Sequence, residues 1–125
     1  MRILAALLLA VLIAGCASQQ SNVVTTTTVQ EGMQSNSEIK VVIRDFAFTP
    51  QVLTIKSGST VTWTNEDSAP HIVASNPHPT HTDLPGFESK RLSKGESYSY
   101  TFTQTGTFGY HCHLHPSMTG QIIVE

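Results

Sequence analysis

The chain has little charge of either sign, and this scarcity excludes several classes of function. It holds 7 Lys and Arg against 9 Asp and Glu, for a net charge of −2, and the basic residues are scattered. A protein that binds nucleic acid through its phosphates needs a clustered basic surface, so nucleic acid is not an expected partner. The sequence also lacks a glycine-rich phosphate loop and a recognisable Ser-His-Asp arrangement, so neither nucleotide binding nor triad hydrolysis is indicated.

Long apolar runs are also missing. The run over residues 3–13 is too short for a mature membrane helix, which needs roughly 20 apolar residues. After the positive Arg2 it indicates the apolar region of a signal peptide. The run ends in two small residues and Cys16, which resembles the lipobox of prokaryotic lipoproteins. The resemblance implies cleavage before Cys16, a diacylglycerol on its thiol and an extracytoplasmic protein anchored to a membrane; ordinary secretion is the alternative.

Residues 17–37 contain mostly Ser, Thr, Gln and Asn, with few apolar or charged side chains. Such a stretch cannot bury enough surface to offset the entropy lost on ordering. We therefore predict three parts: a signal peptide (1–15), the lipidated Cys16 with a disordered polar tether (16–37), and one small domain (38–125).

The apolar pattern of residues 38–125 has a period of two, which is typical of half-buried strands. Turn signals rich in Gly, Pro, Asn and Ser separate the strands at roughly 8–12-residue intervals, and no helical pattern is convincing. These features favour an all-β sandwich or small barrel. The exception is the stretch 76–93, rich in Pro, His and Gly, which is long enough to be a functional loop. The alternating positions are Ile39, Val41, Ile43, Val61, Trp63, Tyr98, Tyr100, Phe102, Ile122 and Val124.

Cysteine is scarce, and its use points to a metal. With Cys16 assigned to lipid, Cys112 is a lone thiol in an oxidising compartment, a liability unless it is buried or ligated. Cys112, His115 and Met118 offer a thiolate, an imidazole and a thioether on one short loop, a set that suits a soft or borderline ion and copper above all. A fourth ligand must come from another strand, and His71, at the start of a predicted strand over 71–75, is the candidate.

These segments resemble the cupredoxins, or blue copper proteins. Residues 61–67 leading to His71 resemble the first-ligand segment of that family, and 109–120 resemble its C-terminal ligand loop. The short Cys-x-x-His-x-x-Met spacing looks like that of the amicyanins rather than the plastocyanins. At Ile72 the sequence departs from these families, which often carry an Asn that hydrogen-bonds toward the Cys loop. The resemblance implies a Greek-key β-sandwich of about seven to eight strands, binding one type 1 copper through His71, Cys112, His115 and a weak axial Met118.

The resemblance further implies an electron carrier and not an enzyme. It would pass single electrons between extracytoplasmic donor and acceptor proteins, with His115 as the electron port. We predict that Leu84, Pro85 and Phe87 add to an apolar docking patch, and that a domain this small is a monomer. Delivery or storage of copper in the envelope is the alternative, because the same ligands could serve it. A metal-free structural module would leave the ligand spacing unexplained.

All six histidines lie between residues 71 and 115. If Cys112 points inward, strand alternation sends His111 and His113 outward to solvent. His78 and His81 fall in a polar loop next to prolines, where surface exposure is the simplest expectation and capture of a metal ion is the alternative. A His-Cys-His run also bridges coppers in copper oxidases, but a catalytic copper there would need further ligands from other domains or subunits.

Overall fold

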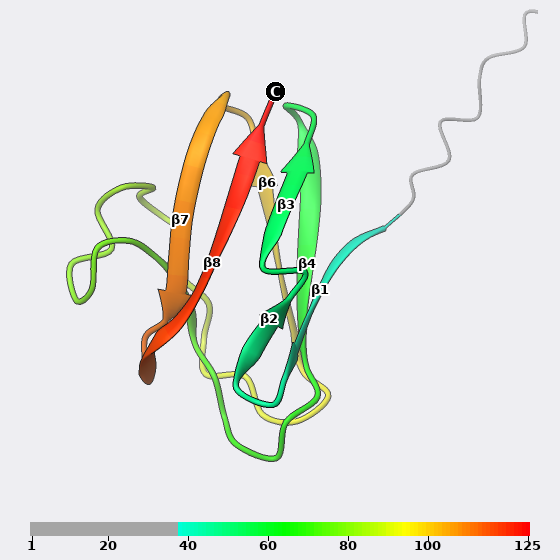
Figure 1. The fold of residues 1–125 in the computed structure, drawn as a ribbon, viewed down its shortest axis with the longest axis vertical. Helices are drawn as coiled ribbons and strands as arrows, with labels where there is room; N and C mark the ends of the chain where they lie inside the picture. Colours follow the sequence, from blue (N-terminus) through cyan, green and yellow to red (C-terminus); the bar gives the residue numbers. More distant parts are fainter. Residues whose placement is uncertain (1–37) are drawn as a thin grey trace, which may run out of the picture. The chain divides into compact units, whose positions relative to one another are not determined.

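A computed structural model describes residues 38–125, which form two four-stranded sheets (Figure 1). The predicted signal peptide, Cys16 and the polar tether lie outside these described residues. Within them there is no helix that could cross a membrane. The prediction of an all-β sandwich is confirmed. The strands are β1 (Ile39–Arg44), β2 (Ala47–Thr49), β3 (Val52–Ile55), β4 (Ser59–Asn65), β5 (Val73–Ser75), β6 (Ser97–Phe102), β7 (Gly106–Cys112) and β8 (His115–Val124).

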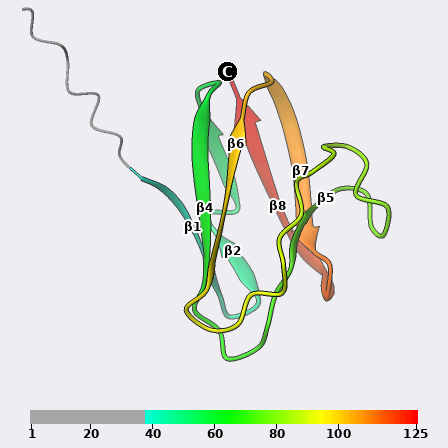
Figure 2. The same cartoon turned by 180° about the vertical axis from the view of Figure 1, so that it is seen from behind.

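The strand order is β2-β1-β4-β6 in one sheet and β3-β8-β7-β5 in the other. Two pairings are parallel, β1 with β4 and β3 with β8, and the remaining pairs are antiparallel. Only β1–β2 and β7–β8 are consecutive strands of the same sheet; every connection from β2 to β7 changes sheets, and Figure 2 shows the sandwich from behind. These crossovers join the two sheets through the loops at both ends of the sandwich.

An aromatic stack around Trp63 joins the two sheets. The Trp63 ring on β4 is fully buried, and its centroid lies 5.2 Å from that of Phe87 and 5.5 Å from that of Tyr110 on β7. Burying a large apolar side chain contributes about 1.5–3 kcal/mol. This packing makes the sandwich a rigid support for the loops at its ends.

The region before β5 differs slightly from the prediction. The regular strand begins at Val73, and His71 instead makes an isolated bridge to Leu92. The bridge is closed by both backbone hydrogen bonds, 3.1 Å from the His71 amide and 2.8 Å from the Leu92 amide. His71 is thus held by a returning loop and not by a neighbouring strand.

The predicted docking role of Leu84 and Phe87 is wrong. Phe87 is 1% exposed and Leu84 is 8% exposed, so both belong to the core. The Phe87 ring packs against Trp63 and lies 4.9 Å, centroid to centroid, from Tyr100. The loop that carries them folds inward because these apolar side chains fill the open edge of the sandwich.

Candidate metal centre

Three of the four predicted ligands meet at one end of the sandwich. His71, Cys112 and His115 each offer an atom within 4.8 Å of the others. The Cys112 Sγ lies 3.5 Å from the Nδ1 atoms of both His71 and His115. His71 and Cys112 are completely buried, while His115 reaches toward the surface.

The β7–β8 hairpin accounts for the positions of Cys112 and His115. The two residues pair directly with each other across a two-residue turn, His113-Leu114. Residues that close a tight hairpin project to the same face of the sheet, so the spacing of three brings the sulfur and the imidazole together. Val73 pairs with Cys112 on the other side, which fixes the cysteine between two strands.

Met118 lies on the buried face of β8, and an irregularity before it lets His115 contact the same site. Cys112 pairs with His115, but the preceding residue, His111, pairs with Thr119, so three residues of β8 have no partner on β7. Met118 is 5% exposed and keeps the alternation of the buried Gly120, Ile122 and Val124, so the bulge changes the phase of the strand at His115 and not at Met118. Met118 lines a small hollow together with Phe46, whose ring packs against both histidines of the cluster.

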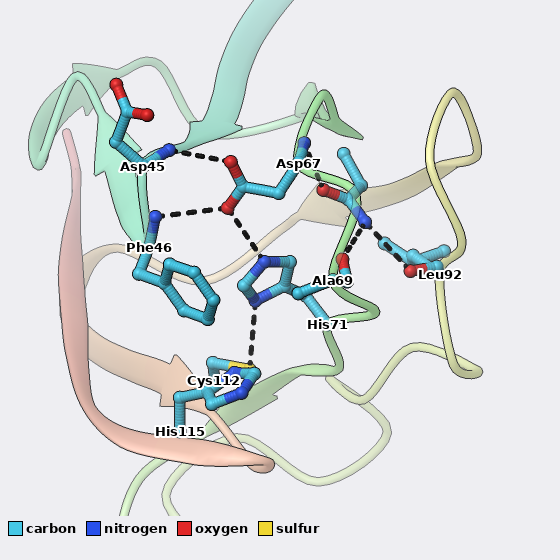
Figure 3. Close-up of polar contacts among 9 residues, drawn as sticks. Asp45, Phe46, Asp67, Ala69, His71, Leu92, Cys112 and His115 are labelled. Carbon is cyan, nitrogen blue, oxygen red and sulfur yellow. Dashed lines mark hydrogen bonds and ion pairs between the residues drawn. The ribbon is translucent and has the colours of Figure 1, made fainter.

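Asp67 fixes the orientation of His71. Its carboxylate Oδ2 accepts a hydrogen bond of 2.9 Å from His71 Nε2, as Figure 3 shows. Because a carboxylate can only accept, Nε2 carries the hydrogen and Nδ1 presents its lone pair to the Cys112 sulfur. A carboxylate behind a histidine is a common way to orient a metal-binding imidazole.

The same carboxylate holds the tight turn between β1 and β2. The amides of Asp45 and Phe46 donate to the Asp67 oxygens at 2.7 and 3.0 Å. Both turn residues have positive φ, 53° and 55°, as a type I′ hairpin requires. The turn places the half-exposed Phe46 ring edge-on against His71 and His115, with centroids 5.5 and 5.0 Å away. Phe46 therefore shields the cluster from solvent.

The pKa values of the pair reflect this environment. Burial lowers the pKa of His71, although the hydrogen bond and negative charge of Asp67 oppose the effect. Burial acts to raise the pKa of Asp67, but the hydrogen bonds from the Phe46 and Asp45 amides and from His71 outweigh it, so this pKa is lowered. Near neutral pH the site therefore holds a neutral His71 beside an ionised Asp67, the state that metal binding requires.

Sequence reasoning missed the residues that support the ligands. Asn65 is buried and its side-chain amide donates to the carbonyls of Ala69 and Leu92, which anchors the loop that leads to His71. The run Asn-Glu-Asp before a proline signalled a turn but not which carboxylate would face the histidine. Ile72 has no side-chain amide to hydrogen-bond toward the Cys loop, but its backbone carbonyl contacts that loop instead. It accepts a hydrogen bond of 2.8 Å from the backbone N–H of His113.

The cluster fits a metal ion with mixed sulfur and nitrogen ligands. With metal–nitrogen and metal–sulfur bonds of about 2.0 and 2.3 Å, as at zinc, two such ligands at a near-tetrahedral angle lie roughly 3.5 Å apart. Both sulfur–nitrogen separations have this value. Two imidazoles and one thiolate, with a thioether nearby, form the donor set of a blue copper site.

Comparison with known proteins agrees with this donor set. Residues 35–125 match the family described as copper binding proteins, plastocyanin/azurin family. The chain belongs to this family. Amicyanin-alpha of Methylorubrum extorquens is 39% identical over 98 residues, which cover 78% of each chain. Amicyanin of Paracoccus denitrificans is 40% identical over 79 residues, which cover 62% of this chain and 56% of that protein.

Solved cupredoxin structures share the fold. A reduced amicyanin variant has a TM-score of 0.63 and 36% identity, with 72% of this chain and 84% of that chain covered. A purple cupredoxin from Nitrosopumilus maritimus has a TM-score of 0.64 and 29% identity, with 70% of this chain and 100% of that chain covered. The cofactor of the family is one type 1 copper, and the His71, Cys112 and His115 cluster with Met118 provides its donors.

The prediction that His111 points to solvent is wrong. Its side chain lies on the opposite face of β7 from Cys112, as alternation requires, but the loop over 76–88 covers that face and leaves His111 only 2% exposed. His113 is half-buried, and His81 has a side chain only 10% exposed. Of the four histidines outside the copper cluster, His78 alone is fully at the surface.

Proposed function

We propose that this domain carries single electrons through a type 1 copper bound by His71, Cys112 and His115, with Met118 as the weak axial ligand. The observation that carries the proposal is the buried Cys112 sulfur, equidistant from two imidazole nitrogens. When bound, copper supplies a one-electron couple. The chain supplies a donor set built on paired strands and on a hydrogen-bonded turn, so the ligands keep their positions whichever charge the ion carries.

The rim of the site is apolar and suits a transient partner. Leu114, which precedes His115 in the chain, is 37% exposed. Phe46, whose ring packs against His115, is 52% exposed. Pro116 is also exposed. We infer that redox donor and acceptor proteins dock here, because a small apolar patch allows quick release. A monomer presents this patch freely.

We also infer that the domain works outside the cytoplasm, attached to a membrane through lipid on Cys16. The support is the sequence: a short apolar run, small residues before the cysteine, and a polar tether after it. Metabolic labelling with a palmitate analogue tests this. Label on the wild-type chain and none on Cys16→Ser is the expected result, and equal labelling of both would contradict it.

The rival function is copper delivery, and a cycling experiment separates the two. The copper-loaded chain is reduced with ascorbate and reoxidised repeatedly in the presence of a copper(I) chelator. A carrier returns to its full blue absorbance after each cycle and yields no chelator complex. Transfer of the copper to the chelator at the first reduction would instead identify a delivery protein.

A further inference from the structure

A second group of histidines lies on the far side of Cys112 from the copper ligands. His78, His111 and His113 each offer a ring nitrogen within 4.8 Å of the others. The ring centroid of His78 lies 5.0 Å from that of His113 and 5.3 Å from that of His111. We call these three the outer histidine cluster. None of them belongs to the copper site described above.

His111 has a nitrogen prepared for a ligand. Its Nδ1 lies 2.9 Å from Asn76 Oδ1 and donates to that oxygen, so Nε2 carries a lone pair. This Nε2 is buried and has no hydrogen-bond partner in the described part of the chain. A buried polar atom without a partner destabilises the folded chain. A metal ion held together with the neighbouring imidazoles would satisfy it.

Asn76 is held in place by the neighbouring strand β7. Its side chain lies against the backbone of Gly109 on β7, where any Cβ would clash with the Asn76 amide. The backbone N–H of Asn76 donates to the Gly109 carbonyl at 3.1 Å. The loop that covers His111 is therefore fixed at its first residue, which keeps the histidine tautomer in place.

His113 is oriented by a chain of two further groups. His81 Nδ1 lies 3.2 Å from a Glu88 carboxylate oxygen and donates to it, so His81 Nε2 is an acceptor. His113 Nδ1 lies 3.0 Å from this Nε2 and donates in turn, which leaves His113 Nε2 with a lone pair. The carboxylate, His81 and His113 repeat the arrangement of Asp67 behind His71. In both cases an acceptor behind the ring selects the nitrogen that remains free.

We propose that the outer histidine cluster binds a divalent transition-metal ion, zinc or copper(II), through three imidazoles. A nitrogen-only set of neutral imidazoles suits these ions and lacks the thiolate that gives a blue site its colour. His78 is exposed, so the ion would face solvent on that side and keep an open coordination position. His111 and His113 flank Cys112, so the two sites are joined through the main chain of a single tripeptide.

Zinc titration of the copper-loaded full-length chain tests the proposal. With copper(II) already in the blue site, calorimetry should show one zinc bound per wild-type chain while the blue absorbance stays constant. His78→Gln should weaken zinc binding by at least about 10-fold. This side chain is exposed, so the fold and the blue absorbance should survive. Asp83→Asn is the matched control, because it changes an exposed residue of the same loop outside the cluster.

Two results would overturn the proposal. One is a copper-loaded wild-type chain that binds no zinc, and the other is zinc binding of equal strength in His78→Gln and Asp83→Asn. A second equivalent of copper(II) gives an independent readout by electron paramagnetic resonance. In the wild type we expect a second copper(II) signal with nitrogen coupling, without any increase in the blue absorbance. Loss of this signal in His78→Gln supports the site, and the same signal in both proteins contradicts it.

Discussion

At the scale of single residues, Asp67 links the metal centre to the fold. Its carboxylate accepts hydrogen bonds from His71 and from the turn amides of Asp45 and Phe46. One side chain therefore sets the tautomer of a copper ligand and the position of the ring that covers it. Neither role could be predicted from the sequence, because three acidic residues lie in the two turns involved and only tertiary packing decides which one faces inward.

Asp67→Ala should lower the free energy of unfolding by about 1–3 kcal/mol, because two backbone donors and a buried imidazole lose their acceptor. Urea unfolding of the metal-free chain measures the loss, with Asp83→Ala as the control. The folded-state pKa of Asp67 lies below its unfolded value of 3.8, so the carboxylate's contribution is complete above that pH. It should vanish as pH falls through the folded pKa. A difference from wild type that persists at lower pH would contradict this assignment.

Phe46 stands at a φ of 55°, a conformation that favours glycine. Phe46→Gly and Phe46→Ala both remove the ring over the histidines, but only alanine keeps the unfavourable Cβ. We expect Phe46→Gly to be more stable than Phe46→Ala by about 1 kcal/mol. Both should lose copper to a chelator faster than wild type. Equal stability of the two variants, or unchanged copper loss, would contradict the account of this turn.

At the scale of elements, strand periodicity predicted the sandwich well but not the local geometry of its ends. Alternation correctly indicated β1, β4 and β6. It gave the wrong surroundings for His111, because a strand pattern shows which face a side chain takes but not which loop will cover that face. The bulge in β8 that lets His115 face the same site as Met118 could not be predicted either, since the sequence records residues and not their pairing. Cys112 and His115 could be predicted as a pair because the short β7–β8 hairpin fixes their spacing.

The β7–β8 pair depends on a glycine opposite an aromatic ring. Tyr110 pairs with Gly120, and a Cβ at Gly120 would clash with the tyrosine ring. Gly120→Ala should therefore destabilise the protein by about 1–3 kcal/mol. In a double-mutant cycle with Tyr110→Leu the two effects should fail to add, because the smaller side chain makes room for the methyl group. Strict additivity in urea unfolding would show that the two residues do not interact.

At the scale of the whole molecule, buried histidines should make the metal-free protein sensitive to acid. Burial is the main cause that lowers the pKa values of both His71 and His111 below 6.5. The unfolded chain then binds protons first as pH falls, so stability is complete above about pH 6.5 and declines below it toward the folded pKa values. Urea unfolding between pH 7.5 and 5 measures the decline. A pH-independent stability would contradict the burial of these rings, and His111→Gln should show a smaller slope.

The apolar rim should control exchange of electrons between molecules. Leu114→Ser should slow electron self-exchange between reduced and oxidised chains, as followed by nuclear magnetic resonance line widths. Val52→Ser is the matched control, since Val52 is 53% exposed and lies on β3, outside the rim. Equal rates for the two variants would show that molecules do not meet at this face.

The central claim is that Cys112 binds copper as a thiolate between two imidazoles, and the visible spectrum during copper(II) titration tests it most directly. The account predicts an intense blue or violet band that saturates at one copper per chain, bleaches reversibly with ascorbate and is absent in Cys112→Ser. A wild-type chain that binds copper with only a pale spectrum, or Cys112→Ser with the same intense band, would contradict it.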